Sequence, residues 1–423
     1  MSGAADGPHR RDAPDRGSPR PPFGLERLRV RGFRSALDAS FAPGRLCALV
    51  GEANSGKSNL LLAIRALLDP SATRFGPEDL AADGDGRIVI DGALAGAGQL
   101  TFTARPPGRS HRSGAEVSVA FLPGELRTRR VLAPVARGAS GGIAPVLARF
   151  SEVLRAALDE GRAGAPTGAA MALVTALERC QEHDVRGLVL LIEEPELYLR
   201  PQAQRYLYRL LRVFADAGNQ VIYSTHSPSF LNVSRLEELA FVARGARSGT
   251  SVAQPASISP DDDFRVLTEF DAERSELFLA RAALLVEGQT EKLAFPFVFG
   301  ALGHDLDREG ISIVACGGKS NIPLFARVCK ATGVPFVAVF DRDAPPGRRP
   351  TYSTRALNTL IVEVVGPGRS VMLAPDFEAA AGLSAHHHKP EHAWRRLRGL
   401  APEQIPPPLT DAVRRVLALA REA

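Results

Sequence analysis

A glycine-rich run at residues 51–58, with the sequence GEANSGKS, holds the residue types that bind a nucleotide phosphate. The run fits the pattern GxxxxGK[ST] and lies between an apolar stretch at 45–50 and a helical stretch at 59–68. The glycines let backbone N–H groups face phosphate oxygens, and the helix N-terminus adds a favourable dipole. Lys57 is expected to reach the β- and γ-phosphates of ATP, and Ser58 to hold Mg²⁺. The predicted ATP-binding residues of the run are Gly51, Asn54, Ser55, Gly56, Lys57 and Ser58.

Two further apolar runs end in polar side chains that suit the same nucleotide site. Residues 187–192 lead into Glu193 and Glu194, a carboxylate pair at a strand end of the Walker B kind. Glu193 is expected to bind ATP on its Mg²⁺ side, and Glu194 to orient and deprotonate the attacking water. Residues 220–223 lead into His226. This histidine either senses the γ-phosphate as a catalytic residue or belongs to an ordinary capped loop.

Carboxylates gather in the second half of the chain, where apolar runs end. Runs at 282–286, 311–315 and 335–340 alternate with helical stretches, which predicts a small parallel sheet with ligands at the carboxyl ends of its strands. Oxygen-only ligands suit Mg²⁺ or Mn²⁺ and argue against zinc. The carboxylates at or just after these strand ends are Glu287, Glu291, Asp341 and Asp343.

The length and composition of the chain limit the classes of protein to which it can belong. With 423 residues, the chain is long enough for two or three globular domains. It has no apolar run of about 18 residues, so no membrane span is expected. Cys47, Cys180, Cys316 and Cys329 are scattered without a ligand spacing, which favours a reduced, cytoplasmic chain. Residues 1–22 are rich in Pro, Gly, Arg and Asp and are predicted to be a disordered leader rather than a secretion signal.

The basic residues are mostly arginine, which makes each lysine informative. The formal net charge is +5, from 52 basic and 47 acidic residues, and it is compatible with DNA as a partner without identifying one. A lysine ammonium is a compact donor of three hydrogen bonds that the planar guanidinium of arginine does not imitate. Four of the five lysines fall within motifs. The five are Lys57, Lys292, Lys319, Lys330 and Lys389.

In this order the motifs resemble those of ABC ATPases and, more narrowly, of the overcoming-lysogenisation-defect (OLD) family of ATPase–nucleases. The resemblance rests on RGFRS at 31–35, GEANSGKS at 51–58, LIEEPELYLRPQ at 191–202 and STHSP at 224–228. The EEPE string with its following LxPQ separates this group from transporter ATPases. Relatives commonly have His before the proline of LxPQ, where this chain has Arg200.

Two departures from the ABC pattern concern ATP turnover. The LSGGQ-like signature, which closes on the nucleotide of an opposite subunit, is matched poorly by residues 161–171, and SGG at 140–142 is a weak alternative. A Q-loop glutamine is not evident. ATP binding is therefore better supported than rapid hydrolysis. Residues 59–187, between the Walker elements, hold no long heptad tract, which excludes an SMC-type coiled-coil arm.

The strings EGQTE, GGKSN and DRD, each after an apolar run, resemble a Toprim domain, and the OLD resemblance continues beyond it. Residues 371–382, VMLAPDFEAAAG, imply Asp376 and Glu378 as further metal ligands, although these acids also suit an ordinary helix N-terminus. Lys389 in the later KPxxA element is implied to stabilise charge on the phosphate. In the relatives two metals act. The implied ligands are Glu287, Glu291, Asp341, Asp343, Asp376 and Glu378, and the implied catalytic residues are Glu287, Asp341, Asp343 and Lys389.

These features predict an α/β chain, with an ABC-type P-loop ATPase domain followed by a Toprim domain that has a parallel, Rossmann-like sheet. The arginines after Trp394 either contact a DNA backbone or form a solvated helical face, and the three histidines at 386–388 are expected to lie in a polar loop. The expected segments are a leader at 1–22, the ATPase domain at 23–250, a linker at 251–275, the Toprim domain at 276–400 and a basic helical tail at 401–423.

The resemblance implies an ATP-dependent, metal-dependent DNA endonuclease that uses ATP and Mg²⁺ or Mn²⁺, with two ions at the Toprim site. Relatives are bacterial and cytoplasmic, commonly form homodimers or larger homo-oligomers, sometimes with a partner protein, and are tied to phage defence or DNA repair. A second hypothesis is a nucleotide-dependent DNA-binding or scaffold protein whose nuclease site is silent. A third is a nuclease that binds ATP as an allosteric ligand and hardly hydrolyses it.

Overall fold

The computed structural model describes most of the chain outside the first 22 residues. The predicted leader, the SGG string, the acidic centre of the linker and the three adjacent histidines lie outside the described residues. None of the described helices combines the length and apolar character that crossing a membrane requires. The described residues are 23–69, 74–82, 84–124, 144–160, 166–231, 233–245, 248–255, 271, 273–344, 349–383 and 389–422.

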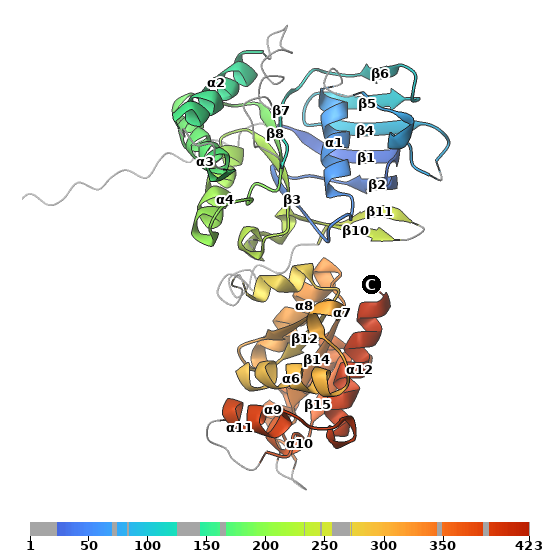
Figure 1. The fold of residues 1–423 in the computed structure, drawn as a ribbon, viewed down its shortest axis with the longest axis vertical. Coiled ribbons are helices and arrows are strands. Elements are labelled where there is room, and N and C mark those ends of the chain that lie inside the picture. The colour runs from blue at the N-terminus through green and yellow to red at the C-terminus, as the bar shows by residue number, and fades with distance from the viewer. Residues whose placement is uncertain are drawn as a thin grey trace, which may run out of the picture.

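A six-stranded, mainly parallel sheet forms the centre of the N-terminal half (Figure 1). Its inner strands are buried on both faces, which explains why they are continuous apolar runs. The strands predicted at 45–50, 187–192 and 220–223 are confirmed as β3, β8 and β9. In spatial order the sheet consists of β11 (Gly249–Ala253), β10 (Leu239–Gly245), β3 (Leu46–Val50), β9 (Gln220–Thr225), β8 (Leu188–Glu193) and β7 (Ser118–Leu122).

A second sheet, antiparallel throughout, covers one side of the first. Helix α1 (Lys57–Leu68) lies between the two sheets, and its apolar residues belong to the core that both sheets share. Its strand β1 largely alternates buried and exposed residues, as a half-exposed strand does. In spatial order the sheet consists of β2 (Ala36–Phe41), β1 (Leu25–Phe33), β4 (Ile88–Leu94), β5 (Gly98–Ala104) and β6 (Ser110–Ser113).

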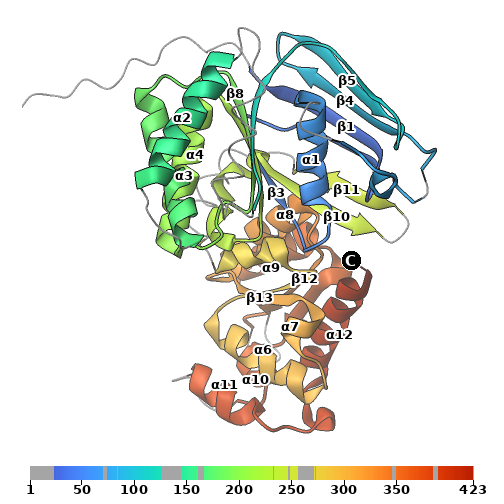
Figure 2. The ribbon, with the colours of Figure 1, turned by 45° about the horizontal axis from the view of Figure 1, so that its top comes forward.

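Three helices cover the other face of the six-stranded sheet (Figure 2). They are amphipathic, and their apolar stripes pack on β3, β8 and β9. This layer leaves the carboxyl ends of the parallel strands open at one edge, where the phosphate loop and the Walker B strand meet. The helices are α2 (Ala144–Glu160), α3 (Pro166–Glu182) and α4 (Pro201–Asp216).

The C-terminal half is built on a small parallel sheet, as predicted, to which β15 adds a fourth strand that was not expected. Alternate residues of β12 and β14 face opposite sides, one packed by α8 and α9 and the other by α6 and α12. The sheet order is β13 (Ile311–Ala315), β12 (Ala282–Val286), β14 (Phe336–Asp341) and β15 (Ser370–Leu373). The helices are α6 (Gln289–Ala301), α7 (Leu306–Glu309), α8 (Ile322–Thr332), α9 (Tyr352–Val365), α10 (Phe377–Ala380), α11 (Lys389–Leu397) and α12 (Pro407–Glu422).

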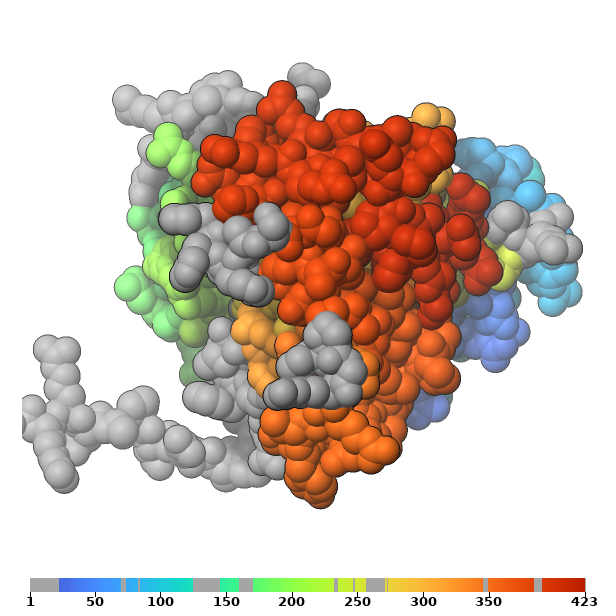
Figure 3. Space-filling model, turned by 90° about the horizontal axis from the view of Figure 1, so that it is seen from below, coloured from blue at the N-terminus to red at the C-terminus, as the bar shows by residue number. Residues whose placement is uncertain are grey.

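The last helix differs from the expected separate tail. Leu409, Val413 and Val416 of α12 are buried against the Toprim sheet, so α12 forms part of this domain's core and its arginines occupy the outer side. Seen from below, C-terminal residues, coloured orange to red, cover the end of the molecule that is remote from the ATPase half (Figure 3).

The two halves share one apolar core. A 3-10 helix, Arg274–Leu279, packs against the ATPase half, and the rings of Phe241 and Phe278 lie 5.8 Å apart. The Nε atom of Arg281 also donates to Oε1 of Glu52 over 3.0 Å. The expected linker at 251–275 therefore overlaps structured elements at both ends: β11 runs to residue 253, and the 3-10 helix begins at residue 274.

Candidate functional site

The phosphate loop lies between β3 and α1 and is pressed against the hairpin of β10 and β11. A Cβ atom on Gly51 would lie 2.1 Å from the carbonyl oxygen of Val242, and one on Gly56 would lie 2.2 Å from Oγ1 of Thr250. Gly56 also has φ of 110°, in the region that glycine adopts most readily. Only glycine fits at these two positions, so the loop backbone is held in place by β10 and β11.

Lys57 folds back onto this loop. Its Nζ atom donates to the carbonyl oxygens of Gly51, over 2.8 Å, and of Glu52, over 2.7 Å. Burial lowers the pKa of Lys57 to about 8, although the negative charges of Glu194, Glu196 and Glu52 act in the opposite direction. A phosphate would give this ammonium a stronger, charged acceptor than two carbonyl groups.

The start of α1 suits an anion. The residue before the helix is Gly56, which has no side chain to cap it. The first N–H groups of α1 therefore receive no hydrogen bond from a capping side chain. The buried Oγ of Ser55 has no hydrogen-bond partner among the described residues, and Ser58 and Asn54 are exposed beside it. The predicted loop residues therefore fit a bound phosphate.

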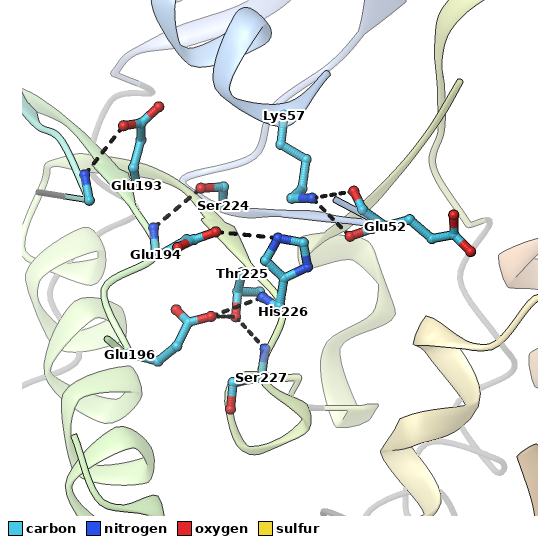
Figure 4. A network of polar contacts seen from close by, with 11 residues as sticks. Glu52, Lys57, Glu193, Glu194, Glu196, Ser224, Thr225, His226 and Ser227 are labelled. Atoms are coloured by element: carbon cyan, nitrogen blue, oxygen red, sulfur yellow. Dashed lines mark hydrogen bonds and ion pairs between the residues drawn. The ribbon is translucent and has the colours of Figure 1, made fainter. Parts of the chain in front are cut away.

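The Walker B residues and His226 meet because β8 and β9 are neighbours, with Glu193 opposite Ser224 (Figure 4). Nε2 of His226 lies 3.3 Å from Oε1 of Glu194. Glu194 has φ of 44°, which turns the chain sharply, and its N–H donates to the carbonyl oxygen of Ser224 over 3.1 Å. The carboxylate of Glu193 accepts from the N–H of Gly124 over 3.3 Å. Burial, together with the charge of Lys57, lowers the pKa of His226, so this imidazole is neutral at pH 7.

Glu196 holds the histidine loop, a role that its place in the EEPE string does not indicate. Its Oε1 atom accepts from the hydroxyl of Thr225 over 2.7 Å and from the N–H of His226 over 2.9 Å. The other oxygen is buried and has no hydrogen-bond partner among the described residues. Burial raises the pKa of this carboxyl group. Glu196 thus fixes the backbone that presents His226 to Glu194.

In the Toprim sheet, Glu287 and Asp341 lie side by side. Glu287 follows β12 and Asp341 is the last residue of the adjacent strand β14, and Oε1 of Glu287 accepts the N–H of Asp341 over 2.7 Å. Burial and the negative charges of neighbouring carboxylates raise the pKa of Asp341 to about 8, and burial raises that of Glu287 to about 7. Oδ1 of Asp341 is buried without a hydrogen-bond partner among the described residues.

Lys319 lies among these carboxylates, although the sequence analysis gave it no role at the site. Its Nζ atom donates to the carbonyl oxygen of Asp341 and, over 2.7 Å, to Oδ2 of Asp343. Only 8% of this lysine is exposed. The signal was its place in GGKSN, where Gly317 and Gly318 have positive φ and turn the chain back toward the site. Asp343 is thereby held by an ammonium group.

Two of the remaining predicted ligands, Glu291 and Glu378, lie near this pair. Glu291 is buried at the start of α6, and its Oε2 accepts the N–H of Gly288 over 3.2 Å. Glu378 is buried in α10, and the charges of Glu291 and Glu378 both contribute to the raised pKa of Asp341. Asp376 caps α10, with its Oδ1 accepting the N–H of Ala379 over 2.8 Å. The backbone of Lys389 begins α11, and its side chain lies outside the described residues.

Among the described residues, no group of three or more Asp, Glu, His or Cys side chains forms a finished cage for a metal ion. The partial site nevertheless fits a hard cation. Asp341 offers a buried oxygen without a partner, and the crowded carboxyl groups hold protons that a cation would displace. Oxygen donors of this kind suit Mg²⁺ or Mn²⁺.

A P-loop with a Walker B pair, joined to a Toprim sheet with an acidic edge, defines an ATPase combined with a Toprim domain. Comparison with family models agrees with this division of the chain. Residues 278–343 match the Toprim domain of overcoming-lysogenization-defect-like proteins, and residues 167–231 match an AAA ATPase domain. The resemblance to the OLD family that the motifs indicate is thereby confirmed.

Curated relatives are similar to parts of the chain. It is 39% identical over 249 residues to the OLD nuclease of Thermus scotoductus, which covers 53% of this chain and 47% of the relative. It is 29% identical over 153 residues to the Old nuclease of Escherichia phage P2, with 34% of this chain and 26% of the relative covered. The chain therefore spans about half or less of the length of these relatives.

A solved structure, the C-terminal region of the Burkholderia pseudomallei OLD protein, aligns with 33% of this chain and 98% of its own length. The sequence identity is 17% and the TM-score is 0.29.

Proposed function

We propose that this chain is a metal-dependent DNA endonuclease whose activity is regulated by ATP bound at the P-loop. The observation that carries the proposal is the pairing of Glu287 and Asp341 at the carboxyl edge of the Toprim sheet. Their hydrogen bond, raised pKa values and partnerless buried oxygen support a site for a divalent cation. The family match of the same residues supports phosphodiester hydrolysis as the reaction.

Each Toprim residue has a distinct task in this proposal. Glu287 and Asp341 would hold the cation directly, with Glu291 and Glu378 adding negative charge around them. Lys319 keeps Asp343 at the edge of the site and balances its charge while no cation is bound. Bound Mg²⁺ or Mn²⁺ would supply positive charge that stabilises the phosphate and makes water a better nucleophile. Lys389 would add a further positive charge near the phosphate.

At the P-loop, the side chains support binding of ATP more directly than rapid hydrolysis. Lys57 and the first turn of α1 would hold the phosphates, and Ser58 and Glu193 would hold Mg²⁺. Glu194 would accept the proton of a water molecule, and the neutral His226 would hold the carboxylate of Glu194 toward the γ-phosphate. The proposed partners are DNA and a second copy of this chain, which would complete the ATP site.

The test is cleavage of supercoiled plasmid with Mg²⁺ or Mn²⁺, with and without ATP. Asp341→Ala should abolish nicking and linearisation, whereas Lys57→Ala should remove only the response to ATP. Asp411→Ala serves as the matched control, because this partly exposed aspartate of α12 pairs with Arg415, which contacts the backbone before β15 and so lies away from the acidic edge.

Cleavage by the wild type and the control but not by Asp341→Ala supports the nuclease. DNA binding without cleavage under every condition contradicts it and favours the scaffold hypothesis. Cleavage that requires ATP without measurable ATP hydrolysis would identify ATP as an allosteric ligand.

A further inference from the structure

Two large aromatic side chains are exposed on the Toprim half of the chain. Tyr352, the first residue of α9, is 81% exposed, and Trp394 of α11 is 37% exposed. Large aromatic rings contribute most to stability when they are buried. An exposed ring beside a candidate DNA-cleaving site therefore points to a ligand with a flat surface.

The fold places these rings at the acidic edge, on opposite sides of the sheet. The backbone runs from the carboxyl end of β14 into α9, and Nδ2 of Asn358 ties α9 back to the carbonyl oxygen of Arg342 over 3.1 Å. Tyr352 lies six residues before Asn358 along the helix, and therefore about 9 Å beyond this edge. Ile361 of α9 packs on the sheet face that carries α8.

Trp394 lies on the other face of the sheet. Its helix α11 packs on α6, which begins directly after Glu287 and Gly288. Ala393 and Leu397 of α11 belong to the core on the face that carries α6 and α12. The two exposed rings thus flank Glu287 and Asp341.

Arginines accompany both rings. The guanidinium of Arg398 lies 5.0 Å from the centre of the Trp394 ring, and Arg395 and Arg396 follow it directly on α11. Arg349 and Arg355 are exposed on either side of Tyr352. Aromatic rings interleaved with cations form the combination that binds a single nucleic-acid strand, because rings stack on bases while cations contact phosphates.

We propose that Trp394 and Tyr352 form a stacking platform for unpaired DNA bases on the two sides of the Toprim site. In a duplex the bases already stack on one another, so their faces are not available to a protein ring. The platform therefore favours a strand that is single-stranded where it passes the carboxylates. This inference rests on the proposed nuclease function and assigns its substrate class.

Trp394 is the single tryptophan of the chain, so its fluorescence reports on this surface directly. The wild type is titrated with an oligothymidylate of about 12 nucleotides, and separately with a duplex of equal length, with Ca²⁺ in place of Mg²⁺. We expect saturable quenching by the single strand and little change with the duplex.

Affinities of the variants are measured by anisotropy of a labelled single strand. Tyr352→Ala and Trp394→Ala should each weaken binding roughly 5- to 100-fold, as removal of one stacking ring does, whereas Trp394→Phe should retain most of it. Tyr206→Ala is the matched control, because Tyr206 is a 39% exposed ring on α4 with a guanidinium, that of Arg209, 5.6 Å from its centre. This control should bind like the wild type, and melting temperatures check that each variant is folded.

Plasmid cleavage by the wild type separates the two ideas. If the protein cleaves plasmid but Trp394 is not quenched and neither alanine variant loses affinity, the platform is wrong and the nuclease stands. If the protein neither cleaves nor binds DNA of either form, the proposed function fails, and the platform fails with it.

Discussion

Glu287 and Asp341 show how a fold changes the chemistry of ordinary carboxyl groups. Each is an acid at the end of a buried strand, and the negative charges of Glu291 and Asp343 act on both. Without a cation, their pKa values of about 7 and about 8 keep protons on them that the unfolded chain would release. Between about pH 4 and pH 8, the folded state therefore holds more protons than the unfolded state, and stability falls as pH rises.

A divalent cation competes for the same oxygens, so its effect on stability should grow with pH. We expect excess Mg²⁺ to raise the melting temperature by several degrees at about pH 8 and by much less at about pH 6. Thermal unfolding with Mg²⁺ or with EDTA at both pH values measures this difference. Asp341→Asn should remove most of the increment. Equal stabilisation at both pH values would show that the cation binds elsewhere.

Lys57, a basic group, should make the affinity for ATP depend on pH. Its pKa of about 8 without nucleotide should rise when phosphate oxygens replace the carbonyl groups of the loop. ATP binding should therefore take up a proton above about pH 8, with affinity falling toward tenfold per pH unit beyond it. Calorimetry in buffers of different ionisation enthalpy counts that proton. Lys57→Ala should bind weakly and show no uptake, and proton release by the wild type would contradict the prediction.

At the residue scale, the sequence indicates which residues belong to a motif, but not which side chains hold each other in place across strands. The loop glycines, Glu194 and Asp341 follow from spacing and strand ends, because those positions are defined locally. Glu196 and Lys319 do not, because their roles depend on groups brought from other strands: Thr225 for the former, and Asp343 for the latter.

At the scale of elements, the turn after β8 and the loop after β9 act as one unit because Glu196 joins them. Glu196→Ala would leave the hydroxyl of Thr225 and the N–H of His226 without their acceptor. We expect a loss of about 1–3 kcal/mol in the free energy of unfolding, with ATP turnover reduced more than ATP affinity. Denaturant unfolding and nucleotide titration measure the two effects. Glu196→Gln retains an acceptor oxygen and should lose less, and an equal loss would show that the charge matters instead.

The parallel strands were predictable because burial on both faces makes them short, continuous apolar runs between motif residues. The antiparallel strands β4 to β6 were not, since half-exposed strands in the stretch after α1 leave a weaker pattern. Helix α12 was taken for a tail because its arginines are prominent in the sequence, whereas its apolar stripe completes the Toprim core.

At the scale of the molecule, we expect the shared core to make the two halves unfold together. Phe278 lies in that core at the junction, packed near Phe241. Phe278→Ala should cost about 3–5 kcal/mol and separate one calorimetric transition into two. Leu293→Ala, on an exposed position of α6, is the control and should keep a single transition. A single transition in Phe278→Ala as well would mean that other contacts couple the halves.

The strand β12 joins two places where chemistry is proposed. Arg281, at its start, contacts Glu52 of the phosphate loop, and Glu287 follows its end, about 20 Å further along. β12 is hydrogen-bonded to a neighbour on each side, so it neither stretches nor slips within its sheet. A shift at Arg281 must therefore reach the acidic edge as a rigid displacement. Under the proposed function, a nucleotide bound at the P-loop would therefore shift the position of Glu287 through β12 without contacting the acidic edge itself.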